Sequence, residues 1–316
     1  MLPQIHYKSI SDLNSSIIRN LHKFPHDADL IVGIPRSGML PANLLALYLN
    51  KPYTDIDSFL DGRIYGCGKR VITIETASNK KILIVDDSIC SGNAIATVKD
   101  RIANAKLDNK FNFIYSAIFA TIESKDKIDI YCEIIETPRF FQWNLFNHPP
   151  FLSHSFCDID GVLCPNPPID DDGDQYIKYI KNAPKLYIPA VEIDTIISCR
   201  LEKYRSITEE WLNKNDIKYK HLILLNLPTK EARQKWRKHG EYKGQLYKDS
   251  NAILFIESSL WEAEKIQKIS QKPVFCIETF DILNNSAIKQ KCHSIVETCK
   301  ILLWKFLCKL HRLKKK

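Results

Sequence analysis

The chain has 316 residues, more than one ordinary hydrophobic core organises, so its length predicts two domains. The N-terminus lacks the apolar stretch of a signal peptide, and no run reaches the roughly 18 apolar residues of a membrane-spanning helix. The net charge of +8 lies within residues 287–316, which carry nine Lys or Arg and one acid. The other 286 residues, with 36 bases and 36 acids, are neutral, and nucleic acid is not an expected partner.

The cysteines give no sign of a zinc site or of a secreted protein. There are ten of them, and no pair has the spacing of a Cys-x-x-Cys zinc ligand pair. In a chain of this size without a secretion signal, reduced thiols and a cytoplasmic location are expected.

The first half of the chain alternates predicted strands and helices. Apolar periodicity predicts helices over 10–23, 40–49 and about 92–106. Apolar runs predict strands over 28–34, 52–59, 70–75, 81–85, 111–122 and 128–135. Three glycines within Asp61–Gly68 predict a loop. Strands that are apolar on both faces and alternate with helices indicate a parallel α/β sheet.

The second half repeats this alternation after a proline- and aromatic-rich stretch over 137–150, where we expect the domain junction. Strands are predicted over 155–159, 193–197, 219–225, 252–256 and 273–277, and helices over 206–215 and 260–269. Ser206 and Glu209 have the spacing of a helix-capping box. The expected fold is α/β, with two doubly wound parallel-sheet domains over 1–148 and 149–284 and a C-terminal helix over 285–316.

The first candidate site follows the predicted strand Ile82–Val85. That strand delivers Asp86 and Asp87 to the carboxyl edge of a sheet, where open α/β folds bind ligands. Two adjacent carboxylates can accept hydrogen bonds from vicinal hydroxyls. The small residues of Ser88–Asn93 then lead into a helix, whose N-terminal N–H groups attract anions. A diol beside a phosphate indicates ribose 5-phosphate.

This stretch resembles the motif by which type I phosphoribosyltransferases bind 5-phosphoribosyl 1-pyrophosphate (PRPP). Gly33–Gly38 is similar to the pyrophosphate loop of that family. Asp61–Gly68, with Arg63, Lys69 and Arg70, falls where the family carries its flexible catalytic hood.

The resemblance implies a Mg²⁺-dependent transfer of phosphoribosyl from PRPP, with a role for each matching residue. Asp86 and Asp87 would hold the ribose hydroxyls. Pyrophosphate, bridged by Mg²⁺, would lie against Arg36, Ser37 and Gly38. The 5-phosphate would lie against Ser88, Cys90, Ser91, Gly92 and Asn93. Asn93 stands where the family usually has glycine, and we expect it to tolerate left-handed backbone angles.

The second candidate site begins with Phe156-Cys157-Asp158-Ile159-Asp160-Gly161. Residues i and i+2 of a strand point the same way, so both carboxylates face one site. Asp158 can attack phosphorus, and Asp160 can protonate the leaving alcohol and later activate water. Mg²⁺ prefers such oxygen ligands. The stretch resembles the first motif of the haloacid dehalogenase (HAD) superfamily of phosphatases.

Other residues match later HAD motifs in family order. Ser198 follows a predicted strand and, with Arg200, would bind the phosphoryl group. Spacing favours Lys243 over Lys248 as the phosphate-binding lysine, and the choice between them stays open. Glu257 would join Asp158 and Asp160 as Mg²⁺ ligands. Many members carry a second acid after that position, where this chain has Ser258 and Ser259.

The basic tail has the pattern of an amphipathic helix. From Ile288 onward, apolar residues recur at intervals of three and four, and lysines fill the other side. Such a helix binds an anionic membrane surface, which would make the protein peripheral on the cytoplasmic face of the inner membrane. The alternative is that the apolar face docks on the protein or on a twin subunit.

The two sites together predict a bifunctional enzyme. The first domain would transfer phosphoribosyl from PRPP to a glycan or glycolipid acceptor, and the second would remove the 5-phosphate to leave ribofuranose. This arrangement is similar to the enzyme pairs that install ribofuranose in bacterial O antigens and capsules. The alternatives are a nucleobase phosphoribosyltransferase fused to a nucleotidase-like domain and a non-catalytic regulator that senses PRPP.

Overall fold

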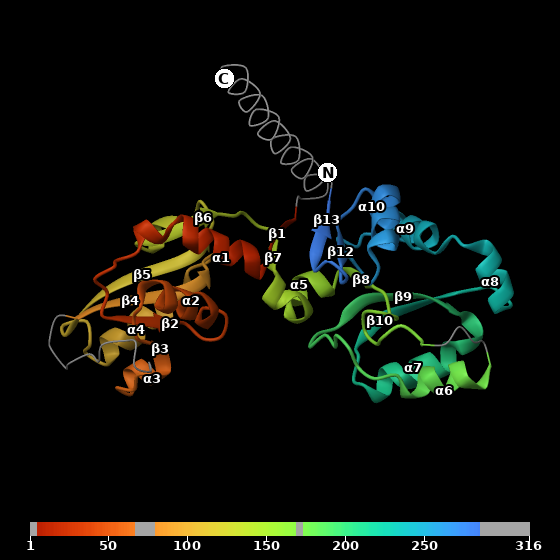
Figure 1. Cartoon of the computed structure of the whole chain (residues 1–316), viewed down its shortest axis with the longest axis horizontal. Coiled ribbons are helices and arrows are strands. Elements are labelled where there is room, and N and C mark those ends of the chain that lie inside the picture. The colour runs from red at the N-terminus through yellow and green to blue at the C-terminus, as the bar shows by residue number, and fades with distance from the viewer. Residues whose placement is uncertain (1–4, 67–79, 169–172, 285–316) are drawn as a thin grey trace, which may run out of the picture. The chain divides into compact units, whose positions relative to one another are not determined.

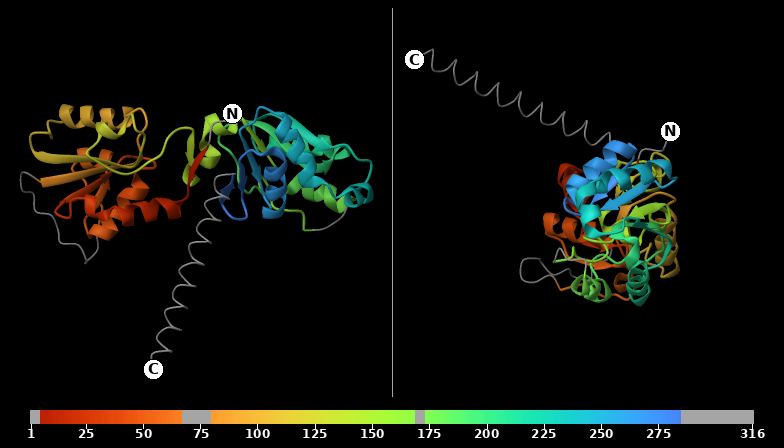
Figure 2. Two further views of the ribbon diagram at one scale, coloured as in Figure 1. Left: turned by 90° about the horizontal axis from the view of Figure 1, so that it is seen from above. Right: turned by 90° about the vertical axis from the view of Figure 1, so that its right-hand side faces the viewer.

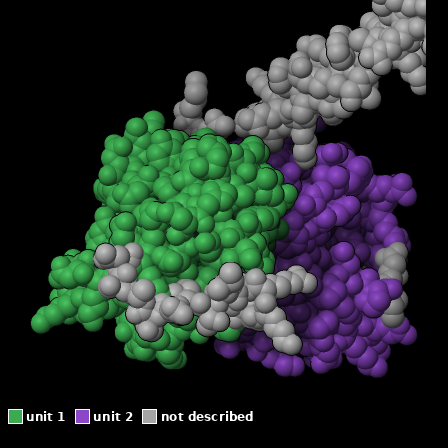
Figure 3. Space-filling view, turned by 60° about the vertical axis from the view of Figure 1, so that its left-hand side comes forward, with its two compact units in different colours: residues 1, 3–143 green, residues 2, 144–316 purple. Residues whose placement is uncertain are grey.

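A computed structural model of the protein describes residues 5–66, 80–168 and 173–284. The chain divides between Trp143 and Asn144 into two compact units, unit 1 and unit 2, which Figure 3 colours separately. Lys69, Arg70, the predicted strand over 70–75 and the predicted tail helix lie outside the described residues. Within the described ranges, no helix combines the length and apolar character needed to cross a bilayer.

Unit 1 is built on a five-stranded sheet. The strands of this sheet are β2 (Leu30–Gly33), β3 (Tyr53–Asp55), β4 (Lys80–Ser88), β5 (Phe111–Ala120) and β6 (Ile130–Ile134), and unit 1 also contains β1 (His6–Lys8) and β7 (Arg139–Phe141). Its helices are α1 (Ile10–Arg19), α2 (Met39–Leu49), α3 (Ile56–Leu60) and α4 (Asn93–Asn104). The sheet order is β3-β2-β4-β5-β6 and every pair is parallel (Figure 1). β1 pairs with β7 in a separate parallel pair.

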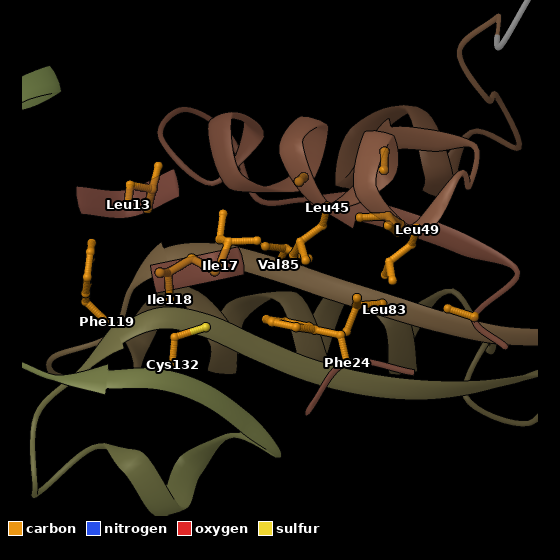
Figure 4. Packing of buried hydrophobic residues seen from close by; sticks show 14 of the residues in the cluster. Leu13, Ile17, Phe24, Leu45, Leu49, Leu83, Val85, Ile118, Phe119 and Cys132 are labelled. Atoms are coloured by element: carbon orange, nitrogen blue, oxygen red, sulfur yellow. The ribbon is translucent and has the colours of Figure 1, made fainter. Parts of the chain in front are cut away.

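The sheet of unit 1 is buried on both faces because its strands carry apolar residues on both. Leu83 and Val85 of β4 point to one face, where they meet Leu45 and Leu49 of α2 (Figure 4). Ile82 and Ile84 point to the other face, where residues of α3 and α4 cover them. Because side chains alternate along the strand, β4 contributes to two hydrophobic cores, one on each face of the sheet.

Two predicted boundaries in unit 1 are wrong for local reasons. The strand predicted over 52–59 is only β3, because Asp55 ends it: its side chain accepts a hydrogen bond from Ser58 N at 2.9 Å and caps α3. The helix predicted over 10–23 ends at Arg19 and is followed by the short 3₁₀ turn Leu21–Lys23.

Unit 2 is built on a six-stranded sheet. Its strands are β8 (Ser155–Cys157), β9 (Ile193–Leu201), β10 (Tyr219–Leu225), β11 (Leu254–Glu257), β12 (Val274–Cys276) and β13 (Asp281–Leu283). Its helices are α5 (Pro149–Leu152), α6 (Asp174–Asn182), α7 (Arg205–Lys214), α8 (Lys230–Trp236), α9 (His239–Asp249) and α10 (Leu260–Ser270). The order is β10-β9-β8-β11-β12-β13, with only β13 antiparallel to its neighbour (Figure 1). Figure 2 shows the ribbon from two further directions, with unit 2 in green to blue.

Helices of unit 2 pack on both faces of its sheet. Apolar residues of α9 and α10 form one core with β8, β11 and β12. On α7, Trp211 is 1% exposed, and its indole N–H donates to Ala183 O at 2.8 Å. The sequence did not predict α6, α8 or α9, and the predicted capping box is wrong: α7 begins at Arg205, with Tyr204 at its cap and no side-chain cap bond.

In both units, the strand order reverses direction beside the strand that carries the candidate acids. β4 lies between β2 and β5, and β8 lies between β9 and β11. Loops that leave adjacent strands in opposite directions open a crevice at the carboxyl edge, where such folds bind ligands. Each sheet therefore places one pair of acids at a crevice.

We predict that Leu45→Ala lowers the unfolding free energy of unit 1 by about 2–5 kcal/mol, because it removes a fully buried side chain between α2 and the sheet. Leu47→Ala makes the same chemical change on the same helix, where the side chain is 70% exposed, and should cost less than about 0.5 kcal/mol. Denaturant unfolding measures both values. Equal losses in the two variants would contradict this account of the core.

Candidate functional site

The two acids of unit 1 lie within strand β4, which continues to Ser88 instead of ending at Val85. Asp86 is 8% exposed and Asp87 is 4% exposed. Asp87 accepts hydrogen bonds from Ser37 Oγ at 3.0 Å and from Trp143 Nε1 at 2.7 Å. Asp86 Oδ1 accepts from Asp87 N at 2.8 Å. The predicted pyrophosphate loop and the acid pair are therefore in direct contact, through Ser37.

Gly38 makes this close approach possible. A Cβ atom at Gly38 would lie 2.5 Å from Ile34 O, 2.8 Å from Val85 O and 2.9 Å from Asp86 Oδ1. Carbon atoms do not approach oxygens that closely without displacing them. Any larger residue would push the loop away from the end of β4.

The acid pair does not ionise as two ordinary carboxylates. Burial, reinforced by the neighbouring charge of Asp87, raises the pKa of Asp86 from 3.8 to about 8. Asp86 therefore holds a proton at neutral pH in the free protein.

Side chains from elsewhere in unit 1 hold the loop that follows β4 in place. Ile89 O accepts hydrogen bonds from Ser124 Oγ at 3.0 Å and from Arg139 Nη2 at 2.8 Å. Arg139 is itself 8% exposed, and its second nitrogen donates to Ile135 O at 2.6 Å. Two segments distant in sequence thus hold the turn that leads into α4.

The left-handed backbone conformation in this loop belongs to Gly92 and not to Asn93. Gly92 has φ 86° and precedes the helix, whereas Asn93 is the first residue of α4. The tolerance of Asn93 for left-handed angles is therefore not needed in this structure, because Gly92 takes that conformation. Ser88 is half-buried, while Cys90, Ser91 and Asn93 are exposed, and Lys127 Nζ donates to Ser91 O at 2.7 Å.

The two described arginines predicted for the first site lie at the surface. Arg36 is exposed and follows a cis peptide bond after Pro35. Arg63 forms an ion pair with Asp61 at 2.7 Å, and its side chain is 67% exposed. Neither is buried with the acid pair.

Unit 2 contains a cavity of about 310 Å³ at the carboxyl edge of its sheet. All the residues predicted for the second site line it: Asp158, Asp160, Ser198, Arg200, Lys243 and Glu257. Side chains that the sequence did not single out complete the wall, including Asn166, Tyr176, Arg233, His239 and Glu262. Lys248, the other candidate lysine, does not line it.

Lys243 lies at the centre of this cavity's charged groups. Its Nζ donates to Asp158 Oδ2 at 2.8 Å, to Glu257 Oε2 at 2.9 Å and to Glu262 Oε2 at 3.1 Å. The side chains of Lys243, Asp158 and Glu257 are 3%, 6% and 1% exposed. Three carboxylates thus share one ammonium group in the interior.

The excess of carboxylates sets the protonation of the cluster. Burial, with Glu257 and Asp160 adding to it, raises the pKa of Asp158 well above its ordinary value, although Lys243 opposes the shift. Burial alone would lower the pKa of Lys243, but the surrounding carboxylates raise it well above its ordinary value. The lysine therefore stays charged. Because carboxyl groups outnumber it, the cluster would be stabilised by further positive charge.

Asp160 has a different partner. Arg200 Nη2 donates to Asp160 Oδ1 at 2.6 Å and Arg200 Nε donates to Oδ2 at 3.0 Å, a bidentate pair. Arg200 is 1% exposed, and its Nη1 is buried without a hydrogen-bond partner in the described structure. Ser198 Oγ accepts from Arg200 N at 3.2 Å. Arg200, which was predicted to bind phosphate, thus forms an ion pair with Asp160 in this structure.

Gly161 allows the turn after the two acids. Its φ is 81°, and a Cβ there would lie 2.4 Å from the Cβ of Ser258. The serine that follows Glu257 therefore packs against the turn, at the point where a larger acidic side chain was anticipated from the HAD resemblance.

The predicted Mg²⁺ ligands are not assembled as a triad. Among the described residues, no group of three or more acidic, histidine or cysteine side chains is placed to hold a metal ion. Lys243 lies between Asp158 and Glu257, and Asp160 is engaged by Arg200. The donor chemistry nevertheless suits Mg²⁺, because carboxylates outnumber the ammonium group in the Lys243 cluster.

Comparison with known proteins gives a family match that covers unit 1 and only the first residues of unit 2. Residues 4–152 match the family model described as the phosphoribosyl transferase domain. This part of the chain is similar to phosphoribosyltransferase domains. The match covers rather less than half of the chain and leaves most of unit 2 outside it. No curated protein matches the chain.

Solved structures of phosphoribosyltransferases also align with part of the chain. One is the xanthine-guanine-hypoxanthine phosphoribosyltransferase of Helicobacter pylori, 18% identical, covering 45% of this chain and 93% of its own with a TM-score of 0.33. Another is the purine phosphoribosyltransferase of Pyrococcus horikoshii, 20% identical, covering 44% and 93% with a TM-score of 0.34. The orotate phosphoribosyltransferase of Aeropyrum pernix is 15% identical, covering 39% and 69% with a TM-score of 0.29. Similarities this low carry no argument about the acceptor.

We predict that Asp86 makes unit 1 less stable as pH rises. Its pKa is about 8 when folded and near 3.8 when unfolded, so between those values only the unfolded chain releases this proton. Ionisation of Asp86 should therefore lower the free energy of unfolding progressively as pH rises across that window. Asp86→Asn should remove this slope, as measured by denaturant unfolding from pH 5 to pH 8.

The matched control is Asp126→Asn, which changes an exposed acid of the same domain. Its stability should follow that of the unaltered protein at every pH. If Asp86→Asn also followed it, Asp86 would be ionised at neutral pH and the burial argument would be wrong.

Proposed function

We propose that this protein is a bifunctional enzyme that installs ribofuranose on a glycan. The phosphoribosyltransferase domain transfers 5-phosphoribosyl from PRPP to a glycan hydroxyl and releases pyrophosphate. Unit 2 then hydrolyses the 5-phosphate. The observation that carries the proposal is the convergence of Asp158, Asp160, Ser198, Lys243 and Glu257 on one cavity.

The acid pair of the first domain suits a sugar diol. Asp87 has Ser37 and Trp143 as donors, so its carboxylate is held in one orientation. Asp86, with its raised pKa, can donate one hydrogen bond and accept another. Ribose hydroxyls offer the complementary groups. The N-terminus of α4, preceded by Gly92, would receive the 5-phosphate.

The second step would proceed through a covalent intermediate on Asp158. A carboxylate oxygen of Asp158 forms a bond to phosphorus while the bond from phosphorus to the ribose 5-oxygen breaks. Asp160, protonated and released from Arg200, would give its proton to that oxygen, which leaves as a hydroxyl. Water then attacks the aspartyl phosphate, Asp160 takes up a proton from it, and inorganic phosphate departs. Lys243 holds Asp158 in place and offsets the charge of the phosphoryl oxygens.

Asp158, Asp160 and Glu257 are the residues that would hold Mg²⁺, once their carboxylates turn from Lys243 and Arg200 towards the ion. The carboxylate excess around Lys243 would favour the ion there. When bound, it would supply positive charge to the phosphoryl group. In the first domain, Mg²⁺ would accompany pyrophosphate beside Arg36, Ser37 and Gly38.

The acceptor we propose is a lipid-linked polysaccharide, and the basic residues of 287–316 would keep the enzyme at an anionic membrane surface on the cytoplasmic side. Transfer to a nucleobase is the main alternative, because the features of a phosphoribosyltransferase domain alone do not distinguish a glycan acceptor from a nucleobase acceptor. A phosphatase on the same chain favours the glycan, because it would otherwise destroy the nucleotide just formed.

We predict that Asp158→Asn stops the reaction after the first step. Removal of the nucleophile should lower phosphate release by at least about a thousandfold. Mass spectrometry of the acceptor should then detect a ribosyl group that still carries its phosphate. Unaltered enzyme should leave plain ribose on the same acceptor.

The complementary variant is Asp87→Asn, which should abolish transfer from PRPP and leave phosphate release from a synthetic 5-phosphoribosylated glycan intact. Nucleotide formation from PRPP and free bases, with no labelling of glycan, would overturn the proposal. So would accumulation of the phosphorylated product by the unaltered enzyme.

A further inference from the structure

Unit 1 has a cavity of about 310 Å³ at the edge of its sheet opposite the acid pair. Leu30, Lys80 and Phe111 line this cavity, and they are the first residues of the parallel strands β2, β4 and β5. Asp86 lies near the other end of β4, about 20 Å away at the usual rise of a strand. The cavity is therefore separate from the site predicted for PRPP.

The wall of this cavity combines apolar and basic side chains. It consists of apolar residues, one glycine and three basic residues: Leu30, Phe59, Leu60, Gly62, Ile64, Ile82, Leu107 and Phe111, with Arg63, Lys80 and Lys110. Among these described lining residues, no side chain is acidic and none is both polar and neutral. Burying the hydroxyl groups of a sugar or the edges of a nucleobase against such a wall is unfavourable, because their hydrogen bonds to water are not replaced by side-chain partners. A hydrocarbon body would instead gain from leaving water.

The lining residues range from fully buried to exposed. Leu30, Phe59 and Ile82 are 2%, 8% and 1% exposed, so they form an apolar floor. The ring centroids of Phe59 and Phe111 lie 5.8 Å apart. Lys80 is half-buried, and Lys110 is exposed. A ligand could therefore place an apolar body on the floor and keep a charged end near the two lysines, in contact with water.

Two of the three basic residues are available to an anion. Arg63 already forms an ion pair with Asp61 at 2.7 Å. Lys81, which follows Lys80 in the chain, forms an ion pair with Asp27 at 2.5 Å. Within the described part of the chain, by contrast, neither Lys80 nor Lys110 has a hydrogen-bond or ion-pair partner. Two unpaired ammonium groups beside an apolar floor favour a ligand with one anionic group.

We propose that this cavity binds a medium-chain acyl anion, with the hydrocarbon chain on the apolar floor and the carboxylate beside Lys80 and Lys110. Ligand pockets span about 300–1,000 Å³. A cavity at the lower end of that range suits one chain of moderate length and not a two-chain lipid. The site would form in unit 1 whatever the acceptor of the phosphoribosyl group, and its position would leave the acid pair free for PRPP.

Equilibrium titration of the full-length protein with decanoate, octanoate and decan-1-ol tests this, with decanoate and octanoate kept below the concentrations at which they form micelles and decan-1-ol below its solubility limit. Decanoate should bind saturably. Octanoate should bind about tenfold more weakly, because two buried CH₂ groups are lost. Saturating PRPP with Mg²⁺ should leave the decanoate affinity unchanged. Displacement of decanoate by PRPP would place the anion at the acid pair and overturn the inference.

Lys80→Gln and Lys110→Gln should each weaken decanoate binding by about two- to fivefold and leave decan-1-ol binding unchanged, because only a charge is lost. The matched control is Lys106→Gln, which removes the same charge from an exposed residue that lies in the same connection between α4 and β5 as Lys110 and does not line the cavity. It should keep the decanoate affinity.

Leu107→Trp narrows the cavity without changing its charge and should weaken decanoate and decan-1-ol binding alike. Thermal unfolding should show that this variant is folded. Absence of saturable decanoate binding to the unaltered protein would overturn the inference. So would equal losses in Lys106→Gln and Lys110→Gln, or a decanoate affinity that neither Lys80→Gln nor Lys110→Gln changes.

Discussion

A single buried ammonium group, Lys243 Nζ, connects the parts of unit 2 on which its chemistry would depend. It comes from α9 and lies within 2.8–3.1 Å of carboxylates from the end of β8, the end of β11 and the first turn of α10. Without it, three carboxylates would face one another in the interior, at a cost of several kcal/mol. With it, they are held together and still carry net negative charge. That combination both fixes the site and leaves it able to accept a cation.

Both units place a pair of acids at the point where the strand order of a mainly parallel sheet reverses. In each, a pair of acids follows an apolar run in the strand beside the reversal of strand order. Glycines allow close approach near these acids: Gly38 to Asp86, and Gly161 to Ser258. The electrostatics differ. Asp86 and Asp87 have no cation in hydrogen-bond contact among the contacts described, and Asp86 keeps a proton, which suits hydroxyl ligands. Asp158 and Asp160 are each held by a buried base, which suits a phosphoryl group and a metal ion.

The sequence predicted the central strands of both sheets, but it missed the short strands β1, β7 and β13 and the contacts between distant segments. Apolar runs predicted the acid-bearing strands β4 and β8 because a buried parallel strand has few other compositions. Nothing local marks Trp143 as a donor to Asp87, or Arg139 as the support of Ile89, since each contact joins segments about 50 residues apart. Helices α8 and α9 were missed because their charged surfaces give weak periodicity. Arg200 was predicted to face phosphate, but its pairing with Asp160 follows from the strand geometry of β9 against β8.

The central claim is that one chain adds a phosphorylated pentose and then removes its phosphate. The most direct measurement uses PRPP labelled with radiocarbon in the ribose ring and with radiophosphorus at the 5-phosphate, incubated with the full-length protein, Mg²⁺ and a lipid-linked glycan extract. The account predicts that the glycan fraction gains radiocarbon alone and that the radiophosphorus appears as inorganic phosphate. Retention of both labels on the glycan, or their joint appearance in a nucleotide, would contradict it.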